Sequence, residues 1–359
     1  MSKNMMYSWI SKVKNYDNIY LITGFHEIQI FLLDYDEKSP LNLIVIPENS
    51  DIEIFLNKVI SNADIGRMRD IPFGVAYWNL NKKSNFFVNK IFFQIEAIFN
   101  ILRLRFFLVN NLKGKIQTNL FIYAYLGNIQ YYIFEKYFSK MSSGHSVIYN
   151  VPNLNQISKV KNPKLTKKII KLIYSLVSGV KMELYKTAMY VTFGSKKFVS
   201  NESSNNPWPL IIKKFDIQLP NIDKDAVLII DAPIQTMLGV KFKESLSRLE
   251  QYIYKSIESK DIYLKPHYNH EFGTFDNSDI LSKFNIIPKG FPVEIYMHFF
   301  NKIYFFTSSA IASSPVNSEN VCLLNILEFK EQKFYNENLR IMKDSVSDRI
   351  SYISFAELT

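Results

Sequence analysis

A short C-terminal segment, Tyr-Leu-Lys-Pro-His, places polar side chains at the end of an apolar run. Lys265 and His267 follow the run, and Pro266 between them fixes the direction of the chain. Histidine titrates near neutral pH, so it can donate a hydrogen bond to a phosphate or protonate a leaving oxygen. A structural or surface histidine would show the same pattern, so this segment alone leaves both roles open.

A second segment, Phe-Phe-Thr-Ser-Ser-Ala, passes from an apolar run directly into Ser308 and Ser309. The two serines are expected to open a helix over 309–313. Free N–H groups at a helix start bind anions, and serine hydroxyls add donors. The alternative is that a serine only caps the helix.

A third segment, Pro-Val-Glu-Ile, places Glu294 in the first turn of a short helix after Pro292. A carboxylate there could bind a ribose diol, or it could simply complement the helix dipole. Glu294 lies 27 residues after His267 and 14 before Ser308. That order predicts that the three segments border successive elements of one sheet.

Apolar runs alternate with helix-like stretches throughout the chain, which predicts an α/β fold with two Rossmann-like, doubly wound domains. Ligands bind such sheets at the carboxyl ends of the strands, so a central cleft between two facing domains is expected. We expect an acceptor-side domain over 1–200 and a nucleotide-sugar-binding domain with a C-terminal tail over 223–359. Residues 201–222 are expected to form a linker, because they begin with a polar run and two prolines. The expected strands are 19–23, 41–47, 73–80, 118–127 and 145–151 in the first domain, and 225–233, 261–267, 302–308 and 321–327 in the second.

The composition of the chain excludes some kinds of site and favours anionic partners. The chain has 359 residues and a net charge of +10, and its single cysteine, Cys322, excludes an intrachain disulfide and a cysteine-based zinc cluster. No signal peptide or transmembrane run is evident, so a cytoplasmic protein is expected. A cluster of lysines predicts a solvated helix face or contact with an anionic bilayer: Lys159, Lys161, Lys164, Lys167, Lys168 and Lys171.

In these motifs the chain resembles the bacterial GT-B sialyltransferases, above all glycosyltransferase family 52 and the bacterial polysialyltransferases. Lys-Pro-His, Pro-Val-Glu-Ile and Ser-Ser-Ala carry the resemblance, together with the opening Asn-Ile-Tyr-Leu-Ile-Thr-Gly-Phe-His-Glu-Ile-Gln-Ile. The expected order of strands and helices is similar over most of the chain, whereas the residues themselves match only in these short stretches. The resemblance implies that His267, Ser308 and Ser309 hold the phosphate of CMP-sialic acid. Lys265 and Glu294 are donor-side candidates from the residues themselves, Lys265 for its charge beside His267 and Glu294 for a ribose diol.

The same resemblance implies an inverting transfer that needs no metal and no cofactor besides the donor. The acceptor would be a bacterial surface glycan or glycolipid, such as lipooligosaccharide or capsule. Contact with the inner membrane surface and a homodimer are compatible with this reading, whereas nucleic acid is not an expected partner because no recognition signature is present.

Two departures from the family pattern leave alternatives open. Tyr268 follows the histidine where the family has proline, and the stretch Ser-Ser-Gly-His-Ser keeps Gly144 without the acidic residues that supply the catalytic base. His145 is one candidate base, and the pair His26 and Glu27 after the first strand is another. The chain could instead use another nucleotide sugar, or be a non-catalytic binding subunit of glycan assembly.

Overall fold

The structure is a computed structural model, and some residues inside its helices and strands are described by their backbone alone. It describes residues 13, 15–22, 25–46, 50–67, 87–111, 118–125, 133, 135–137, 144–151, 165–179, 197–200, 207–237, 239–257, 261–267, 274–275, 279–288, 290–308, 310–311, 314–315, 317–345 and 350–353. The chain divides into two compact units, Met1–Ser203 and Ser204–Thr359.

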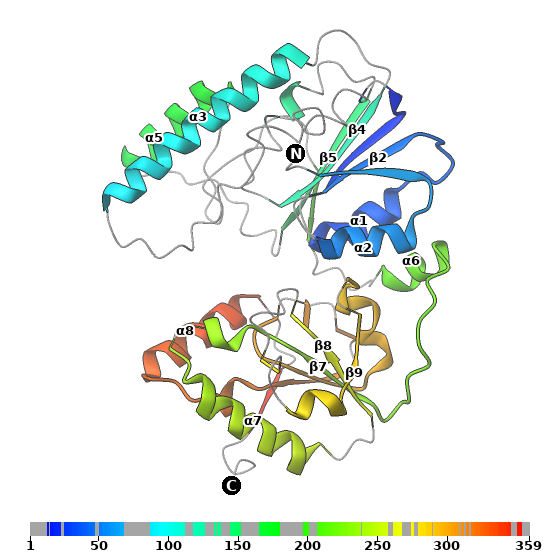
Figure 1. The fold of residues 1–359 in the computed structure, drawn as a ribbon, viewed down its shortest axis with the longest axis vertical. Coiled ribbons are helices and arrows are strands. Elements are labelled where there is room, and N and C mark those ends of the chain that lie inside the picture. Colours follow the sequence, from blue (N-terminus) through cyan, green and yellow to red (C-terminus); the bar gives the residue numbers. More distant parts are fainter. Residues whose placement is uncertain are drawn as a thin grey trace. The chain divides into compact units, whose positions relative to one another are not determined.

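The first unit contains a six-stranded parallel sheet in the order β3-β2-β1-β4-β5-β6 (Figure 1). Its strands are β1 Asn18–Ile22, β2 Asn42–Ile46, β3 Ala63–Arg67, β4 Asn119–Tyr125, β5 Gly144–Val151 and β6 Lys197–Ser200. Its helices are α1 Phe25–Asp34, α2 Ser50–Val59, α3 Phe87–Asn111 and α5 Leu165–Ser178. All residues of β1 and β2 are buried, as expected for inner strands of a parallel sheet with both faces covered.

The second unit repeats this topology with β7 as its first strand, because its sheet runs β12-β11-β10-β7-β8-β9 and is also parallel. Its strands are β7 Val227–Ile230, β8 Ile262–Lys265, β9 Asn285–Ile286, β10 Lys302–Phe305, β11 Glu319–Cys322 and β12 Ser351–Tyr352. Its helices are α6 Trp208–Lys214, α7 Phe242–Ser256 and α8 Gln332–Ser345. Both sheets therefore have the strand order of the Rossmann fold, which confirms the prediction of two doubly wound domains.

A row of asparagine side chains ties the amino ends of three neighbouring strands of the first sheet. Asn18 donates to the side-chain oxygen of Asn42 at 3.0 Å, and Asn119 donates to that of Asn18 at 3.1 Å. The next position in this row is Gly144, where a Cβ atom would lie 3.1 Å from Oδ1 of Asn119. Gly144 thus leaves room for the amide of Asn119.

Some elements differ from the sequence-based expectations. The prolines that suggested a linker instead flank the start of α6, where a first-turn proline costs no hydrogen bond; Trp208 and Ile211 of this helix are buried. The run expected as a strand over 321–327 leaves the sheet after Cys322 and forms the 3-10 helix Leu324–Ile326. The strand expected over 73–80 lies outside the described residues.

Candidate functional site

The carboxyl edge of the second sheet is where the sequence segments around His267 and Ser308 come together in the topology. Strands β8 and β10 lie on either side of β7, and the register sets Lys265, Ile230 and Phe305 in one row. Two strand spacings, about 10 Å, therefore separate the backbones of β8 and β10. His267 follows this row by two residues and Ser308 by three, so both segments leave the sheet at the edge where doubly wound folds bind ligands.

Asp231, the residue directly after β7, organises this edge, and the sequence motifs did not single it out. Its buried carboxylate accepts the N–H of Ala232 at 2.8 Å and the N–H of Thr274 at 3.1 and 3.2 Å from its two oxygens. The hydroxyl of Thr274 donates in turn to the carbonyl of Ala232 at 2.7 Å. Asp231 thus ties the end of the central strand to the segment that follows His267.

We expect Asp231→Ala to destabilise the second unit by about 2–3 kcal/mol, because buried N–H groups lose a charged acceptor. Asp231→Asn should cost less, since its Oδ1 can still accept from Ala232 while its amide group faces the N–H of Thr274. Urea denaturation measures the stability, and hydrogen exchange at the Thr274 amide reports the local opening. An alanine variant as stable as the parent, with Thr274 still protected, would contradict this role.

Lys265 and His267 occupy different environments although they are two residues apart. Lys265 is buried, and its ammonium group donates to the carbonyl of Pro288 at 3.3 Å, beyond the end of β9. His267 is half-buried after the buried Pro266. Lys265 therefore links β8 to the crossover after β9, whereas His267 is partly exposed at the edge.

Ser308 accepts a hydrogen bond at the point where the sequence predicts the start of a helix. Its Oγ accepts the N–H of Ala310 at 3.3 Å, and its carbonyl accepts that of Ile311 at 3.4 Å. Residues 310 and 311 are in 3-10 conformation, whereas the rest of the expected helix 309–313 lies outside the described residues. The hydroxyl proton of Ser308 is still a donor, while Ser309 lies outside the described residues.

Glu294 lies in the crossover from β9 to β10. It belongs to the 3-10 helix η8, Val293–Ile295, which Pro292 begins, and its side chain is half-buried between the buried Val293 and Ile295. The short helix and the first-turn position are those that the sequence predicts. The crossover starts at the carboxyl end of β9, two strands from β7.

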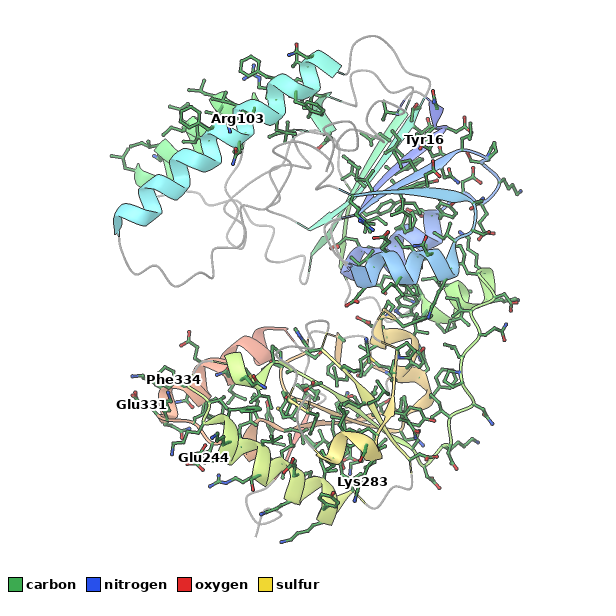
Figure 2. All side chains as sticks on the ribbon, in the orientation of Figure 1. Tyr16, Arg103, Glu244, Lys283, Glu331 and Phe334 are labelled. Carbon is green, nitrogen blue, oxygen red and sulfur yellow. The ribbon has the colours of Figure 1, made fainter. Side chains whose placement is uncertain are left out.

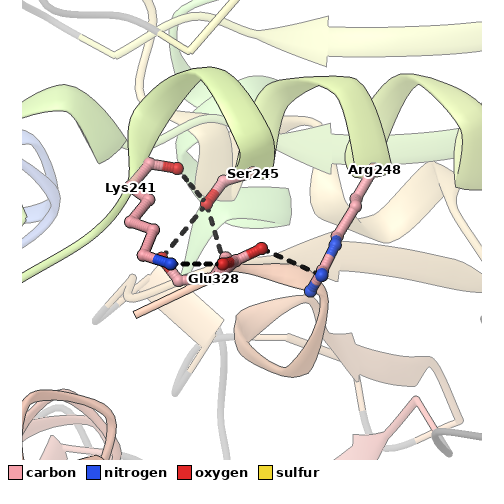
Figure 3. Close-up of polar contacts among 4 residues, drawn as sticks. All are labelled: Lys241, Ser245, Arg248 and Glu328. Atoms are coloured by element: carbon pink, nitrogen blue, oxygen red, sulfur yellow. Dashed lines mark hydrogen bonds and ion pairs between the residues drawn. The ribbon is translucent and has the colours of Figure 1, made fainter. Parts of the chain in front are cut away.

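A cluster of polar contacts joins the start of α7 to the segment around Glu328; it consists of Lys241, Ser245, Arg248 and Glu328 (Figure 3). The Glu328 carboxylate contacts Lys241 at 2.6 Å and Arg248 at 2.9 Å, while its backbone N–H donates to the Ser245 hydroxyl at 2.9 Å. The hydrogen bond from Lys241 lowers the pKa of the Glu328 carboxyl and raises the pKa of Lys241 itself. The charged side chains are partly exposed, so their ion pairs contribute little energy, and the cluster mainly holds the backbone at Glu328 against the start of α7.

In the first unit the structure separates the expected base candidates. Glu27 lies in the first turn of α1, directly beyond the carboxyl end of β1, and its side chain is buried. His145 is the second residue of β5 and pairs with Leu120, so it lies toward the amino end of the sheet. Topology therefore places Glu27, and not His145, at the carboxyl edge of the sheet, the edge where doubly wound folds bind ligands. The side chain of His26 lies outside the described residues.

In the part of the chain that the structure describes, no three His, Cys, Asp or Glu side chains gather in a way that could hold a metal ion. Cys322 is buried in β11, and burial raises the pKa of its thiol to about 12. A thiol in that state is a small apolar core side chain, not a nucleophile.

Comparisons with known proteins give weak matches. No family model and no curated protein matches the sequence. Among solved structures, the UDP-GlcNAc 2-epimerase from Methanocaldococcus jannaschii is 13% identical with a TM-score of 0.39, over 92% of this chain and 93% of that one. The E. coli heptosyltransferase WaaC with ADP-2-deoxy-2-fluoro heptose is 8% identical with a TM-score of 0.34, over 85% and 87%. Similarity at this level carries no argument about function, so the fold assignment rests on the strand order of the chain itself.

Proposed function

We propose that the chain is a GT-B glycosyltransferase that transfers sialic acid from CMP-sialic acid to a bacterial surface glycan, with inversion and without a metal. In this proposal the His267 imidazole and the Ser308 and Ser309 hydroxyls donate hydrogen bonds to the CMP phosphate. Those bonds stabilise the charge that develops on the phosphate as the bond to the sugar breaks. Glu294 would contact the ribose and Lys265 would add positive charge on the donor side.

One observation carries the proposal: the strands that lead to His267 and Ser308 flank β7 in a Rossmann-type sheet and end in the same row. Two distant motifs of the family resemblance thereby reach one edge, which is the edge that binds nucleotides in doubly wound folds. The fold by itself would not be sufficient, because one fold hosts many functions.

The acceptor hydroxyl needs a base, and Glu27 is the candidate that topology favours. It follows β1 at the carboxyl edge of the first sheet, whereas His145 lies near the amino end of β5. A carboxylate in this position can accept the proton of the attacking hydroxyl. Because the Glu27 side chain is buried, this role requires that substrate binding give the acceptor access to it.

A second candidate function is nucleotide-sugar binding without sialyl transfer, or transfer from another nucleotide sugar. The observation that favours it is the absence of an acidic pair in Ser-Ser-Gly-His-Ser, together with the packing role of Gly144 against Asn119. If Gly144 serves the asparagine row, its match to the family motif says nothing about catalysis.

A panel of nucleotides in a thermal unfolding assay separates these readings. A ligand at 100 times its Kd stabilises the folded state by about 2.7 kcal/mol, which corresponds to a rise in Tm of roughly 5–10 °C for a unit of this size. We expect CMP to give this rise, and UMP, UDP, GDP and ADP to give much less. A larger rise with a uridine, guanosine or adenosine nucleotide would contradict CMP-sialic acid as the donor.

A further inference from the structure

The helix α5 exposes an apolar stripe to solvent. Five large side chains recur at the spacing of one helix face, within an arc of about 100° at 3.6 residues per turn. We call them the α5 stripe: Leu165, Ile169, Leu172, Ile173 and Leu176, all exposed. Isolated exposed apolar residues are ordinary, but a continuous row along three turns of one helix marks an interaction surface.

The stripe is not the face by which α5 packs on the protein. Helices α3 and α5 lie side by side (Figure 1) and contact each other. The guanidinium of Arg105 on α3 donates to the carbonyls of Leu176 and Val177 at 3.2 and 3.3 Å, and Lys136 donates to the carbonyl of Gly179. Ser178, on the opposite side of α5 from the stripe, is buried. The described contacts of α5 thus lie at its C-terminal end and on the side of Ser178, away from the stripe.

Positive charge accompanies the exposed apolar side chains. Lys168 is exposed beside the stripe, within the lysine-rich segment 159–171, and the whole chain carries a net charge of +10. On α3, Arg103 (Figure 2) is exposed among further exposed apolar side chains: Phe99, Phe106 and Val109. Cations beside an apolar helix face complement the anionic headgroups and acyl boundary of a bilayer, whereas a protein partner would have no particular need of them.

A helix of this kind would lie in the bilayer interface and not cross it. At 14 residues α5 is about 21 Å long, shorter than a hydrocarbon core of about 30 Å. Among all the described helices, none is long and apolar enough to span a membrane.

We propose that α5 docks the first unit on an anionic membrane surface, with the α5 stripe buried at the acyl boundary and Lys168 at the level of the headgroups. This inference does not rest on the proposed enzymatic function. It would hold for any reaction that the chain performs, and its failure would leave that function untouched.

Co-sedimentation of the full chain with vesicles tests the docking. We expect binding to vesicles of phosphatidylcholine with about 30% phosphatidylglycerol, whose anionic headgroups attract cationic side chains, and much weaker binding to phosphatidylcholine alone. The double variant Leu172→Ser/Leu176→Ser should reduce partitioning about tenfold or more, because two apolar side chains no longer enter the bilayer. Lys168→Glu should reduce it about tenfold on anionic vesicles, since it replaces an attraction with a repulsion.

Leu210→Ser provides the matched control. Leu210 on α6 is 65% exposed, close to Leu172 at 60% and Leu176 at 68%, but it belongs to the second unit and should not change vesicle binding. Circular dichroism shows whether each variant keeps its fold. Failure of the parent to bind anionic vesicles, or full binding by the double variant, would overturn the proposal. A third contradicting result would be a parent that is dimeric and does not bind vesicles, with a double variant that is monomeric. The α5 stripe would then be the interface with a second copy of the chain.

Discussion

His267→Ala is expected to slow sialyl transfer by about 10²–10³-fold while the second unit stays folded. Removal of one preorganised donor to a developing negative charge has an effect of this size. The imidazole follows β8 at the carboxyl edge and is half-buried, so its loss opens no large cavity in the core. Release of CMP from CMP-sialic acid in the presence of an acceptor glycan measures the rate.

His298 offers a control for the loss of a histidine. It lies in the 3-10 helix Met297–Phe299, which leads into the amino end of β10, and burial lowers the pKa of its imidazole. It is therefore neutral near pH 7 and lies before the strand whose far end carries Ser308. His298→Ala should keep the parent rate. Equal rates for the parent and His267→Ala would remove the phosphate-binding role of His267.

Gly239→Ala is expected to destabilise the second unit by roughly 2–5 kcal/mol. Gly239 has a φ of 76°, which costs a residue with a Cβ about 1–2 kcal/mol, and overpacking of a tight contact adds about 1–3 kcal/mol. An added Cβ would lie 2.2 Å from the ring of Phe334 on α8 and 2.6 Å from its Cβ, so a rotation of the ring alone could not make room. The backbone there is also fixed, because the backbone N–H of Lys330 donates to the Gly239 carbonyl at 2.8 Å.

Native-state hydrogen exchange of the β7 and β10 amides measures the stability of the second unit separately from that of the first. Gly144→Ala is the matched control. Its added Cβ would lie 3.1 Å from the tip of the Asn119 side chain, and its backbone is not left-handed. We expect this variant to lose about 1 kcal/mol of stability or less, measured by exchange of the β1 and β4 amides. Adding Phe334→Ala to Gly239→Ala should remove the clash with the ring but restore stability only in part, because the Cβ of residue 334 would still lie 2.6 Å from the added Cβ and the φ strain would remain. If Gly239→Ala costs no more than Gly144→Ala, the packing of Phe334 on this loop is wrong.

The central strands could be predicted because both of their faces are buried. β1, β2 and β7 consist almost wholly of apolar residues and stand out in the sequence as continuous runs. The edge strands lack that signal: β3 reads Ala-Asp-Ile-Gly-Arg and is only partly buried, and β9 and β12 have two exposed residues each. Apolarity also misleads where a buried run is not extended, as in the segment that turns after Cys322.

The candidate site was only partly accessible to sequence reasoning. His267 and Ser308 were found because each follows an apolar strand, and parallel strands bring such positions to one edge. The contacts that shape this edge join residues far apart in the sequence, as Asp231 and Thr274 do across 43 positions and Lys241 and Glu328 across 87. A carboxylate directly after Val-Leu-Ile-Ile was a usable signal for Asp231, but its partner is fixed only by the path of the loop.

The central claim is that the edge formed by His267 and Ser308 holds a nucleotide through its phosphate. Calorimetric titration of CMP and of cytidine, into the parent and into His267→Ala, isolates that contact. We expect the parent to bind CMP about 100-fold more tightly than cytidine, since charge-assisted hydrogen bonds contribute about 1.5–3 kcal/mol each. In His267→Ala the preference for CMP over cytidine should fall by about tenfold or more, while the affinity for cytidine should equal that of the parent. Equal affinity of the parent for CMP and cytidine, or an unchanged preference in the variant, would contradict the claim.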